Sequence, residues 1–121
     1  MPLPSLQHWT WQGEEGIFAV GYRQQSCEGT GAPVLLVHGF GASSDHWRAN
    51  IAPLAEQQPV WALDLLGFGS SDKPRSRLVD ERQGPGSVRY CFDLWAQQVA
   101  DFACQVVQPQ KPLQLVGNSI G

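Results

Sequence analysis

A serine lies at the centre of the five-residue sequence GNSIG (117–121), which follows a short apolar stretch. A serine hydroxyl becomes a nucleophile when a sharp turn presents it to a cleft and a base removes its proton. At such a turn Gly117 and Gly121, two positions before and after the serine, must be small, because larger side chains would collide with backbone. The spacing therefore predicts Ser119 as a nucleophile, with the Ile120 N–H facing developing negative charge. A turn serine without chemistry is the alternative.

A second glycine-rich turn, HGFG (38–41), follows the apolar run Val34–Val37. Glycine lets the backbone approach a substrate closely. The Phe40 N–H is the most plausible second donor to an oxyanion, beside that of Ile120, and one such donor is worth roughly 3 kcal/mol of transition-state stabilisation. The Phe40 side chain could pack under the turn while its N–H faces the site.

The histidines His8, His38 and His46 all precede Ser119. Since other serine hydrolases place histidine and aspartate before serine, a triad of His38, Asp64 and Ser119 has to be considered. His38 abuts the glycine turn, however, and the sequence favours an anchor for that turn over a base. Asp64, at a strand end, is expected to cap the next turn, and His46 to be exposed.

Apolar patterning predicts strands and helices that alternate. Residues 9–11 and 17–23 predict a β-hairpin whose loop is longer than the tightest types. Apolar runs at 34–37, 60–65 and 113–116 predict strands buried on both faces. A helix capped by Ser44 is expected to bury Trp47, Ile51 and Leu54. A second helix, over about 90–107, carries an apolar stripe at 95, 99, 102 and 106.

This order predicts an α/β fold, a hairpin followed by a parallel βαβαβ sheet with helices on both faces. Ligands bind such sheets at the turns after the carboxyl ends of strands. Three turns qualify, 38–43, 65–71 and 117–121. The polar segment 73–86 is expected to be a solvated loop, its basic residues Lys73, Arg75 and Arg77 being interleaved with acidic ones.

Composition excludes several function classes. The chain has 121 residues and a net charge of −3, which suits one domain and argues against nucleic-acid binding. No apolar run is long enough to span a bilayer. Three cysteines, an odd number at no metal-like spacing, suggest buried thiols in a reducing, cytoplasm-like compartment. No glycine-rich turn completes a dinucleotide- or phosphate-binding motif, so no cofactor is expected.

The stretches HGFGASSDHW (38–47), DLLGFGSSDKP (64–74) and GNSIG (117–121) resemble the α/β-hydrolase fold superfamily. They look most like the pheophytinase-like and chlorophyll-dephytylase-like hydrolases of plants and cyanobacteria, and the resemblance covers nearly the whole chain. It implies Ser119 as the catalytic nucleophile and the Phe40 and Ile120 backbones as the oxyanion hole. The implied site-shaping residues are His38, Gly39, Gly117 and Gly121.

The resemblance also implies carboxylic ester hydrolysis of small hydrophobic substrates, phytyl esters of chlorophyll-type pigments among them, and a cytoplasmic, plastid or cyanobacterial setting. The family places its acid and histidine after the serine, so residues 1–121 would be the N-terminal part of one hydrolase domain, truncated after the nucleophile elbow. On that basis the chain alone would be catalytically silent, and its last strand would expose an apolar edge prone to aggregation. Haloperoxidase-like or C–C hydrolase activity without a cofactor is the nearest rival in the superfamily.

Overall fold

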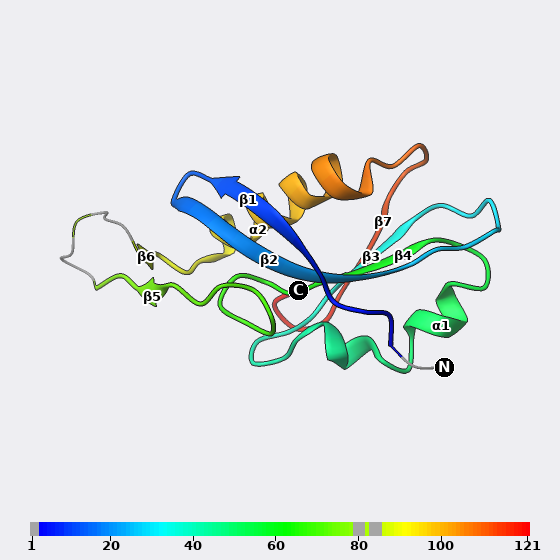
Figure 1. The fold of residues 1–121 in the computed structure, drawn as a ribbon, viewed down its shortest axis with the longest axis horizontal. Coiled ribbons are helices and arrows are strands. Elements are labelled where there is room, and N and C mark those ends of the chain that lie inside the picture. Colours follow the sequence, from blue (N-terminus) through cyan, green and yellow to red (C-terminus); the bar gives the residue numbers. More distant parts are fainter. Residues whose placement is uncertain (1–2, 79–81, 83–85) are drawn as a thin grey trace.

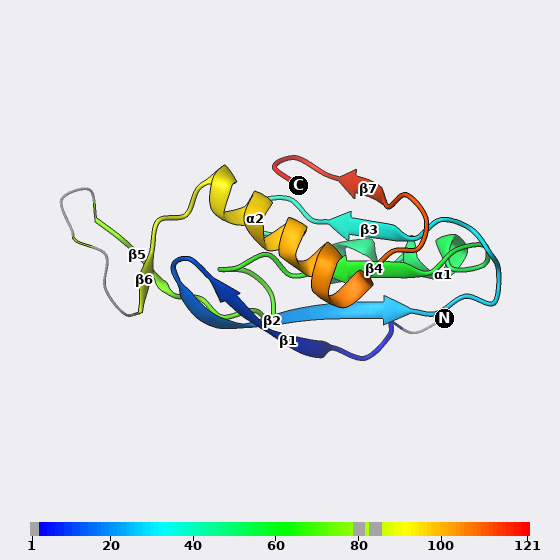
Figure 2. The same cartoon turned by 90° about the horizontal axis from the view of Figure 1, so that it is seen from above.

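The computed structural model describes residues 3–78, 82 and 86–121, which form a mixed five-stranded sheet with helices on both faces (Figures 1 and 2). The sheet order is β1-β2-β4-β3-β7, in which β3 runs parallel to both β4 and β7, and β2 runs antiparallel to β4. The strand bounds are β1 Gln7–Gly13, β2 Gly16–Gln25, β3 Val34–Val37, β4 Val60–Leu63 and β7 Gln114–Gly117. The α/β fold with an N-terminal hairpin is therefore confirmed.

The hairpin turn is tighter than the sequence suggested. Gly13 pairs with Gly16, which leaves Glu14 and Glu15 as a two-residue loop. The expectation of a longer loop was wrong because both glycines, which usually mark turns, continue the strands. Gly16 has φ +147, a conformation that glycine adopts more readily than other residues.

The central strands β3 and β4 separate two apolar cores, which explains their unbroken apolar sequence. Side chains alternate along a strand, so Leu35 and Val37 face one core whereas Val34 and Leu36 face the other. All four residues of β3 are buried, and so are all four of β4. The strand expected over 60–65 ends earlier, at Leu63, and Asp64 is the first residue after it.

Short helices cover the face of the sheet to which Val34 and Leu36 point. The 3-10 helix η1 (Ser44–Trp47) and helix α1 (Ile51–Leu54) bury Trp47 and Ile51 as expected. The N-cap is Ser43 and not Ser44: Ser43 is extended, and its Oγ accepts a hydrogen bond from the Asp45 N–H at 3.2 Å. Ser44 already belongs to the helix, so its own N–H is free to bond elsewhere.

One longer helix covers the opposite face. Helix α2 (Phe92–Phe102) continues into a π-helical turn, η2 (Ala103–Val107), and lies across the sheet (Figure 2). Phe102 is fully buried in the core on this face, against the hairpin. The Trp11 indole N–H also donates to the Asp101 carboxylate at 2.8 Å. The helix expected over 90–107 is thus confirmed, with a change of helix type near its end.

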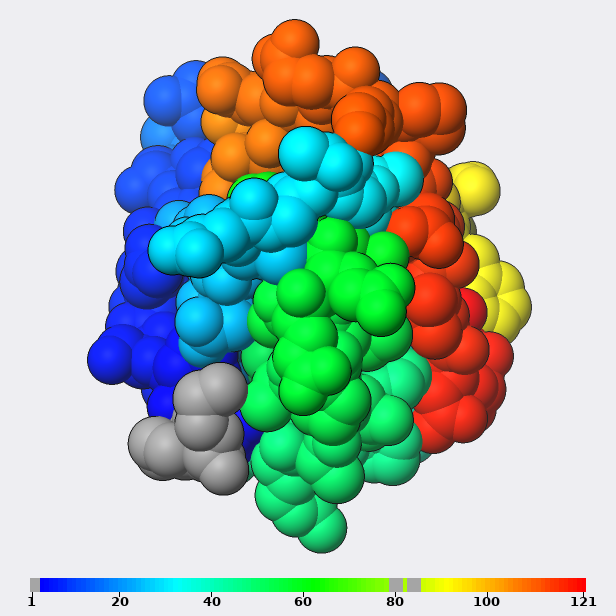
Figure 3. All heavy atoms as spheres, turned by 90° about the vertical axis from the view of Figure 1, so that its right-hand side faces the viewer, coloured from blue at the N-terminus to red at the C-terminus, as the bar shows by residue number. Residues whose placement is uncertain are grey.

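Strand β7 differs from the expectation of a third buried strand. All four of its residues are exposed, including Leu115 at 61% and Val116 at 42%. Within the described residues it pairs with β3 alone (Figures 2 and 3). Helix α2 contacts the hairpin strand β1, at the opposite edge of the sheet from β7. The apolar side chains of β7 therefore lie at an open edge, as expected for a sheet that stops at this strand.

The polar segment after β4 contains a short strand pair and takes part in an ion pair. Strands β5 (Arg75–Ser76) and β6 (Ser87–Val88) pair in parallel beyond the main sheet (Figure 1). The Arg77 side chain is only 8% exposed and forms an ion pair with Glu15, so the expected solvated basic face is wrong at this residue. The interleaved acidic residues 80 and 81 lie outside the described residues.

The three cysteines are free, but they are not buried as the sequence suggested. Cys27 and Cys91 are half-buried, and Cys104, which lies in η2, is exposed. In the ranges 3–78 and 86–121, together with residue 82, we find no helix with the length and apolar content needed to cross a bilayer.

Candidate functional site

Ser119 lies on a strained turn directly after β7. The turn is closed by the Gly121 N–H, which donates to the Asn118 carbonyl at 3.0 Å, and is tied to β3 by the Asn118 N–H, which donates to the Val37 carbonyl at 3.2 Å. Ser119 has φ 61, in the left-handed region that non-glycine residues rarely adopt. Such a conformation costs on the order of 1–3 kcal/mol and concentrates at functional sites. Ser119 is an exposed residue.

The two flanking glycines are required by packing. A Cβ atom on Gly117 would overlap the backbone of Gly121, and one on Gly121 would overlap the Val37 carbonyl oxygen. Backbone atoms cannot move aside as flexible side chains do. The requirement for small residues on both sides of the serine, which the sequence predicted, is therefore met by direct contact with backbone.

The glycine turn after β3 packs against this serine turn. A Cβ atom on Gly39 would lie 2.9 Å from the Ser119 Cβ and 3.0 Å from the Asn118 carbonyl oxygen. Within the part of the chain that the structure describes, neither the Phe40 N–H nor the Ile120 N–H donates a hydrogen bond to a protein group. Two backbone donors without a protein acceptor thus belong to the two turns that meet at Ser119.

His38 joins the glycine turn to the turn after β4. Its ring is fully buried; Nδ1–H donates to the Gly39 carbonyl at 2.8 Å, and Nε2 accepts from the Leu65 N–H at 3.0 Å. Burial lowers the pKa of His38 from its usual 6.5, outweighing the hydrogen bond to Gly39 and the charge of Asp64, which raise it. A neutral imidazole with both nitrogens bonded to backbone cannot also accept a proton from Ser119.

Asp64 connects the start of η1 to the turn after β4 through its buried carboxylate. Oδ1 accepts from the Ser44 N–H at 2.6 Å, and Oδ2 accepts from the Ser70 N–H at 3.1 Å and from the Ser70 hydroxyl at 2.7 Å. Gly69 lies so close that a Cβ there would be 2.5 Å from Oδ1. These contacts are those of a turn cap, and none of them involves His38 or Ser119.

Gln98 is a buried supporting residue that the sequence analysis did not identify. It is fully buried on α2, where its Oε1 accepts from the Leu66 N–H at 2.9 Å and its amide donates to the Asp64 carbonyl at 3.2 Å. A signal was present, since Gln98 lies on the same helical face as Trp95 and Phe102. A polar residue within an apolar stripe indicates a buried hydrogen-bonding role.

The Phe40 side chain does not pack under its turn. It is 74% exposed, and its ring meets Phe68 edge-on at a centroid distance of 5.4 Å. The packing under the turn that the sequence left open is therefore not found, and the Phe68 ring also lies edge-on to His38 at 5.6 Å. An aromatic surface therefore borders the glycine turn.

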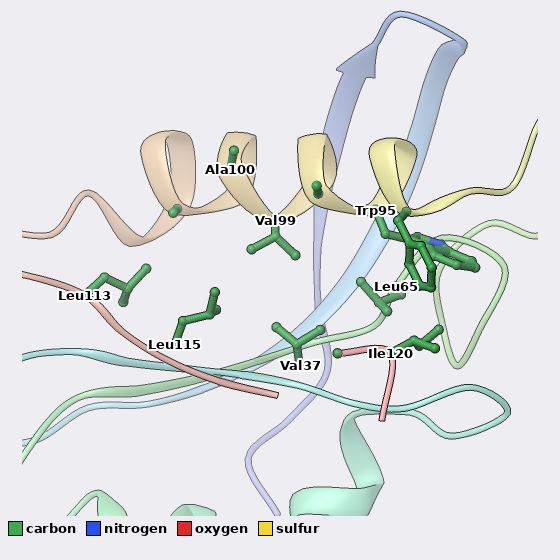
Figure 4. A pocket seen from close by; sticks show the side chains of 12 residues that line it. Val37, Leu65, Trp95, Val99, Ala100, Leu113, Leu115 and Ile120 are labelled. Carbon is green, nitrogen blue, oxygen red and sulfur yellow. The ribbon is translucent and has the colours of Figure 1, made fainter. Parts of the chain in front are cut away.

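An apolar groove of about 550 Å³ lies under the serine turn, between α2 and β7. Figure 4 shows Ile120 directed toward it, close to Leu65 and Trp95, while Leu115 enters from β7 and Leu113 from the residue just before that strand. The Ile120 side chain thus lies on the groove side of the turn. The lining of the groove also includes Val37, Phe92, Val99, the small residues Ala96, Ala100 and Ala103, and Gly121.

Comparisons with known proteins agree with this geometry. The chain is 29% identical over 137 residues to the chloroplastic pheophytinase of Arabidopsis thaliana, covering 97% of this chain and 27% of pheophytinase. It matches the crystal structure of a bacterial membrane phospholipase A with a TM-score of 0.70 and 33% identity, covering 96% of this chain and 32% of that one. A probable hydrolytic enzyme from Pseudomonas aeruginosa PAO1 matches with a TM-score of 0.79 and 20% identity, over 98% of this chain and 34% of that one.

The chain therefore spans between a quarter and a third of the length of these relatives. A family model for the alpha/beta hydrolase fold matches residues 32–121, from the loop before β3 to the end of the serine turn. The match includes both glycine turns and the strands that carry them. The chain belongs to the alpha/beta hydrolase fold family, and among the proteins compared it is similar to pheophytinase.

Proposed function

We propose that Ser119 is the nucleophile of a serine hydrolase that cleaves carboxylic esters of hydrophobic compounds. The observation that carries the proposal is the left-handed backbone of Ser119 on an exposed turn, between Gly117 and Gly121, where no side chain fits. A strained serine of this kind suits a nucleophile, because the turn holds its hydroxyl group out toward a substrate. Membership of the alpha/beta hydrolase fold family supports the same role.

The reaction would proceed through an acyl-enzyme. The Ser119 oxygen attacks the ester carbonyl carbon while a base takes the hydroxyl proton, and the carbonyl oxygen becomes an oxyanion. The free N–H groups of Phe40 and Ile120 would donate to that oxyanion, each being worth roughly 3 kcal/mol. The ester C–O bond then breaks, the alcohol leaves with the proton, and water releases the acid by the same steps in reverse order.

His38 and Gly39 would shape the oxyanion turn, and Gly117 and Gly121 the nucleophile turn. His38 does so by tying the Gly39 carbonyl to the Leu65 N–H. Gly39 does so by allowing the two turns to touch. These four residues would then act on the geometry of the site without touching the reacting atoms.

The base and its acid would come from other parts of the hydrolase fold. In the family the acid and the histidine follow the serine. Among the described residues, none of the three histidines forms a hydrogen bond with Ser119, and His38 already uses both ring nitrogens. We therefore propose that the 121-residue chain by itself is catalytically silent, because a serine without a base is a poor nucleophile.

The substrate class is proposed from the surface beside the turn and from the relatives. Exposed Phe40, backed by Phe68, offers an apolar contact for the acyl or alcohol group of an ester. Similarity to pheophytinase over 97% of the chain supports a phytyl ester of a chlorophyll-type pigment. The steps above use no cofactor. The free cysteines suit a reducing compartment such as the cytoplasm.

A fluorophosphonate probe tests the proposal, because it reacts with an activated serine by losing fluoride. We expect labelling of the product that carries the remainder of the fold, no labelling of its Ser119→Ala variant, and no labelling of the 121-residue chain alone. Labelling that survives Ser119→Ala would refute the role of this serine. Labelling of the 121-residue chain would refute its silence, and hydrolysis of only non-ester substrates would favour the haloperoxidase-like or C–C hydrolase alternative.

A further inference from the structure

A polar contact joins the serine turn to the helix that follows the glycine turn. The Asn118 side-chain amide donates to Nε2 of His46 at 3.2 Å, across 72 positions of sequence. Asn118 directly precedes Ser119, and His46 lies in η1. Within the described residues this is the one hydrogen bond by which a side chain of the serine turn reaches another element.

His46 is exposed, as the sequence predicted, and its ring packs against the neighbouring Trp47. It lies edge-on to Trp47, with a centroid distance of 5.1 Å and an interplanar angle of 85°, and Trp47 itself is buried. The His46 N–H donates to the Ser43 carbonyl at 3.0 Å, and the neighbouring Ser44 N–H is bonded to buried Asp64. The backbone that carries the His46 ring is therefore anchored to the rest of the fold.

The serine turn is otherwise tied to the sheet through backbone, since the Asn118 N–H donates to the Val37 carbonyl and Gly121 packs against that same carbonyl. It extends from β7, an exposed strand at the open edge of the sheet, and it carries the backbone strain of Ser119. It also touches Gly39 of the glycine turn. The contact between Asn118 and His46 adds a side-chain link to η1, so the serine turn is joined both to the glycine turn and to the helix that follows it.

We propose that His46 and Asn118 are positioning residues that hold the Ser119 turn at its working distance from the glycine turn. The inference rests on the proposed function of Ser119. An amide that donates to Nε2 requires the proton of the neutral imidazole to be on Nδ1. The pair therefore makes a spectroscopic prediction that does not depend on activity, as well as a kinetic one.

The first test measures the His46 tautomer by long-range ¹H–¹⁵N NMR correlation in the product with the complete fold at neutral pH. We expect the Nδ1–H tautomer in the wild type and a shift toward Nε2–H in Asn118→Ala, since the acceptor role of Nε2 is then lost. An Nε2–H tautomer in the wild type, or a spectrum that Asn118→Ala leaves unchanged, would overturn the proposal.

The second test measures the rate at which a fluorophosphonate labels Ser119 in the product with the complete fold. We expect His46→Ala and Asn118→Ala each to slow labelling by about three- to tenfold, the effect of one neutral hydrogen bond. The double variant should be no slower than the single ones, because both remove the same contact. His46→Gln, which keeps an acceptor, should restore most of the rate, and His8→Ala, at an exposed position of β1, should leave it unchanged.

The outcomes separate the two proposals. A wild type that is not labelled at Ser119 refutes the proposed function, while the tautomer measurement still decides whether the contact exists. A labelled wild type whose rate is unaffected by His46→Ala, or whose two single effects multiply in the double variant, refutes the positioning role alone.

Discussion

Replacing Gly39 by alanine would place a methyl group between the two turns that meet at Ser119. The added Cβ would lie 2.9 Å from the Ser119 Cβ, whereas ordinary contact begins at 3.4 Å. It would also lie 3.0 Å from the Asn118 carbonyl oxygen, which belongs to the backbone and cannot rotate away. The two turns must therefore move apart by about half an ångström or more for the methyl group to fit.

That displacement acts directly on the proposed chemistry. A misplacement of about 1 Å can lower a rate on the order of a hundredfold, so we expect Gly39→Ala to slow the labelling of Ser119 by roughly 10- to 100-fold. Stability should fall by about 1–3 kcal/mol, the usual effect of overpacking. Labelling rates come from fluorophosphonate time courses on the product with the complete fold, and stability comes from urea denaturation.

Gly41 supplies a matched control in the same turn. It has φ +76 and no atom within 4 Å of a Cβ placed on it, so Gly41→Ala meets strain but no collision. We expect it to lower stability by about 1–2 kcal/mol, the cost of a left-handed alanine, with a labelling rate within about threefold of the wild type. If Gly41→Ala slowed labelling more than Gly39→Ala, contact between the two turns would not control the reactivity of Ser119.

Three further predictions concern the supports of the site. Asp64→Asn should lower the free energy of unfolding by about 1–3 kcal/mol in urea, since an amide cannot accept every bond from Ser44 and Ser70; an unchanged midpoint would contradict this. Because burial lowers the pKa of His38 below its usual 6.5, the unfolded chain takes up this proton first, so stability should fall as the pH drops below about 6.5. In His38→Asn that part of the pH dependence should vanish, and its persistence would show that other groups cause it. Leu115→Glu should raise the monomer fraction of the 121-residue chain in size-exclusion chromatography with light scattering, because Leu115 is 61% exposed at an open edge; a monodisperse wild-type monomer would refute that reasoning.

The sequence was a reliable guide where structure depends on local patterning. The apolar runs at 34–37 and 60–65 contain strands buried on both faces, the second one ending at Leu63, because each strand alternates between two cores. The stripe on α2 and the pairing of Trp47 with Ile51 followed from helical spacing. Local signals misled where a residue type has two uses: glycines 13 and 16 were read as loop, and they pair within the hairpin.

The sequence by itself also identified which residues belong together at the site, since the GNSIG and HGFG turns each follow a strand of a parallel sheet. It did not show how they touch. Gly39 and Ser119 are distant in sequence, and their contact arises only because β3 and β7 are neighbours in the sheet. The exposure of β7 likewise depends on which strands flank it, which no local pattern encodes.

Tertiary structure alone decided the roles of the polar groups. Both ring nitrogens of His38 are bonded to backbone, one of them to Leu65 on another turn, and Asn118 meets His46 across the site. Hydrogen bonds of this kind join segments that only the folded chain brings within about 3 Å, so residue type and spacing leave them open. What the sequence determined was the pattern of strands, helices and glycines; the fold decided which polar side chains support the turns, and it left Ser119 exposed where those turns meet.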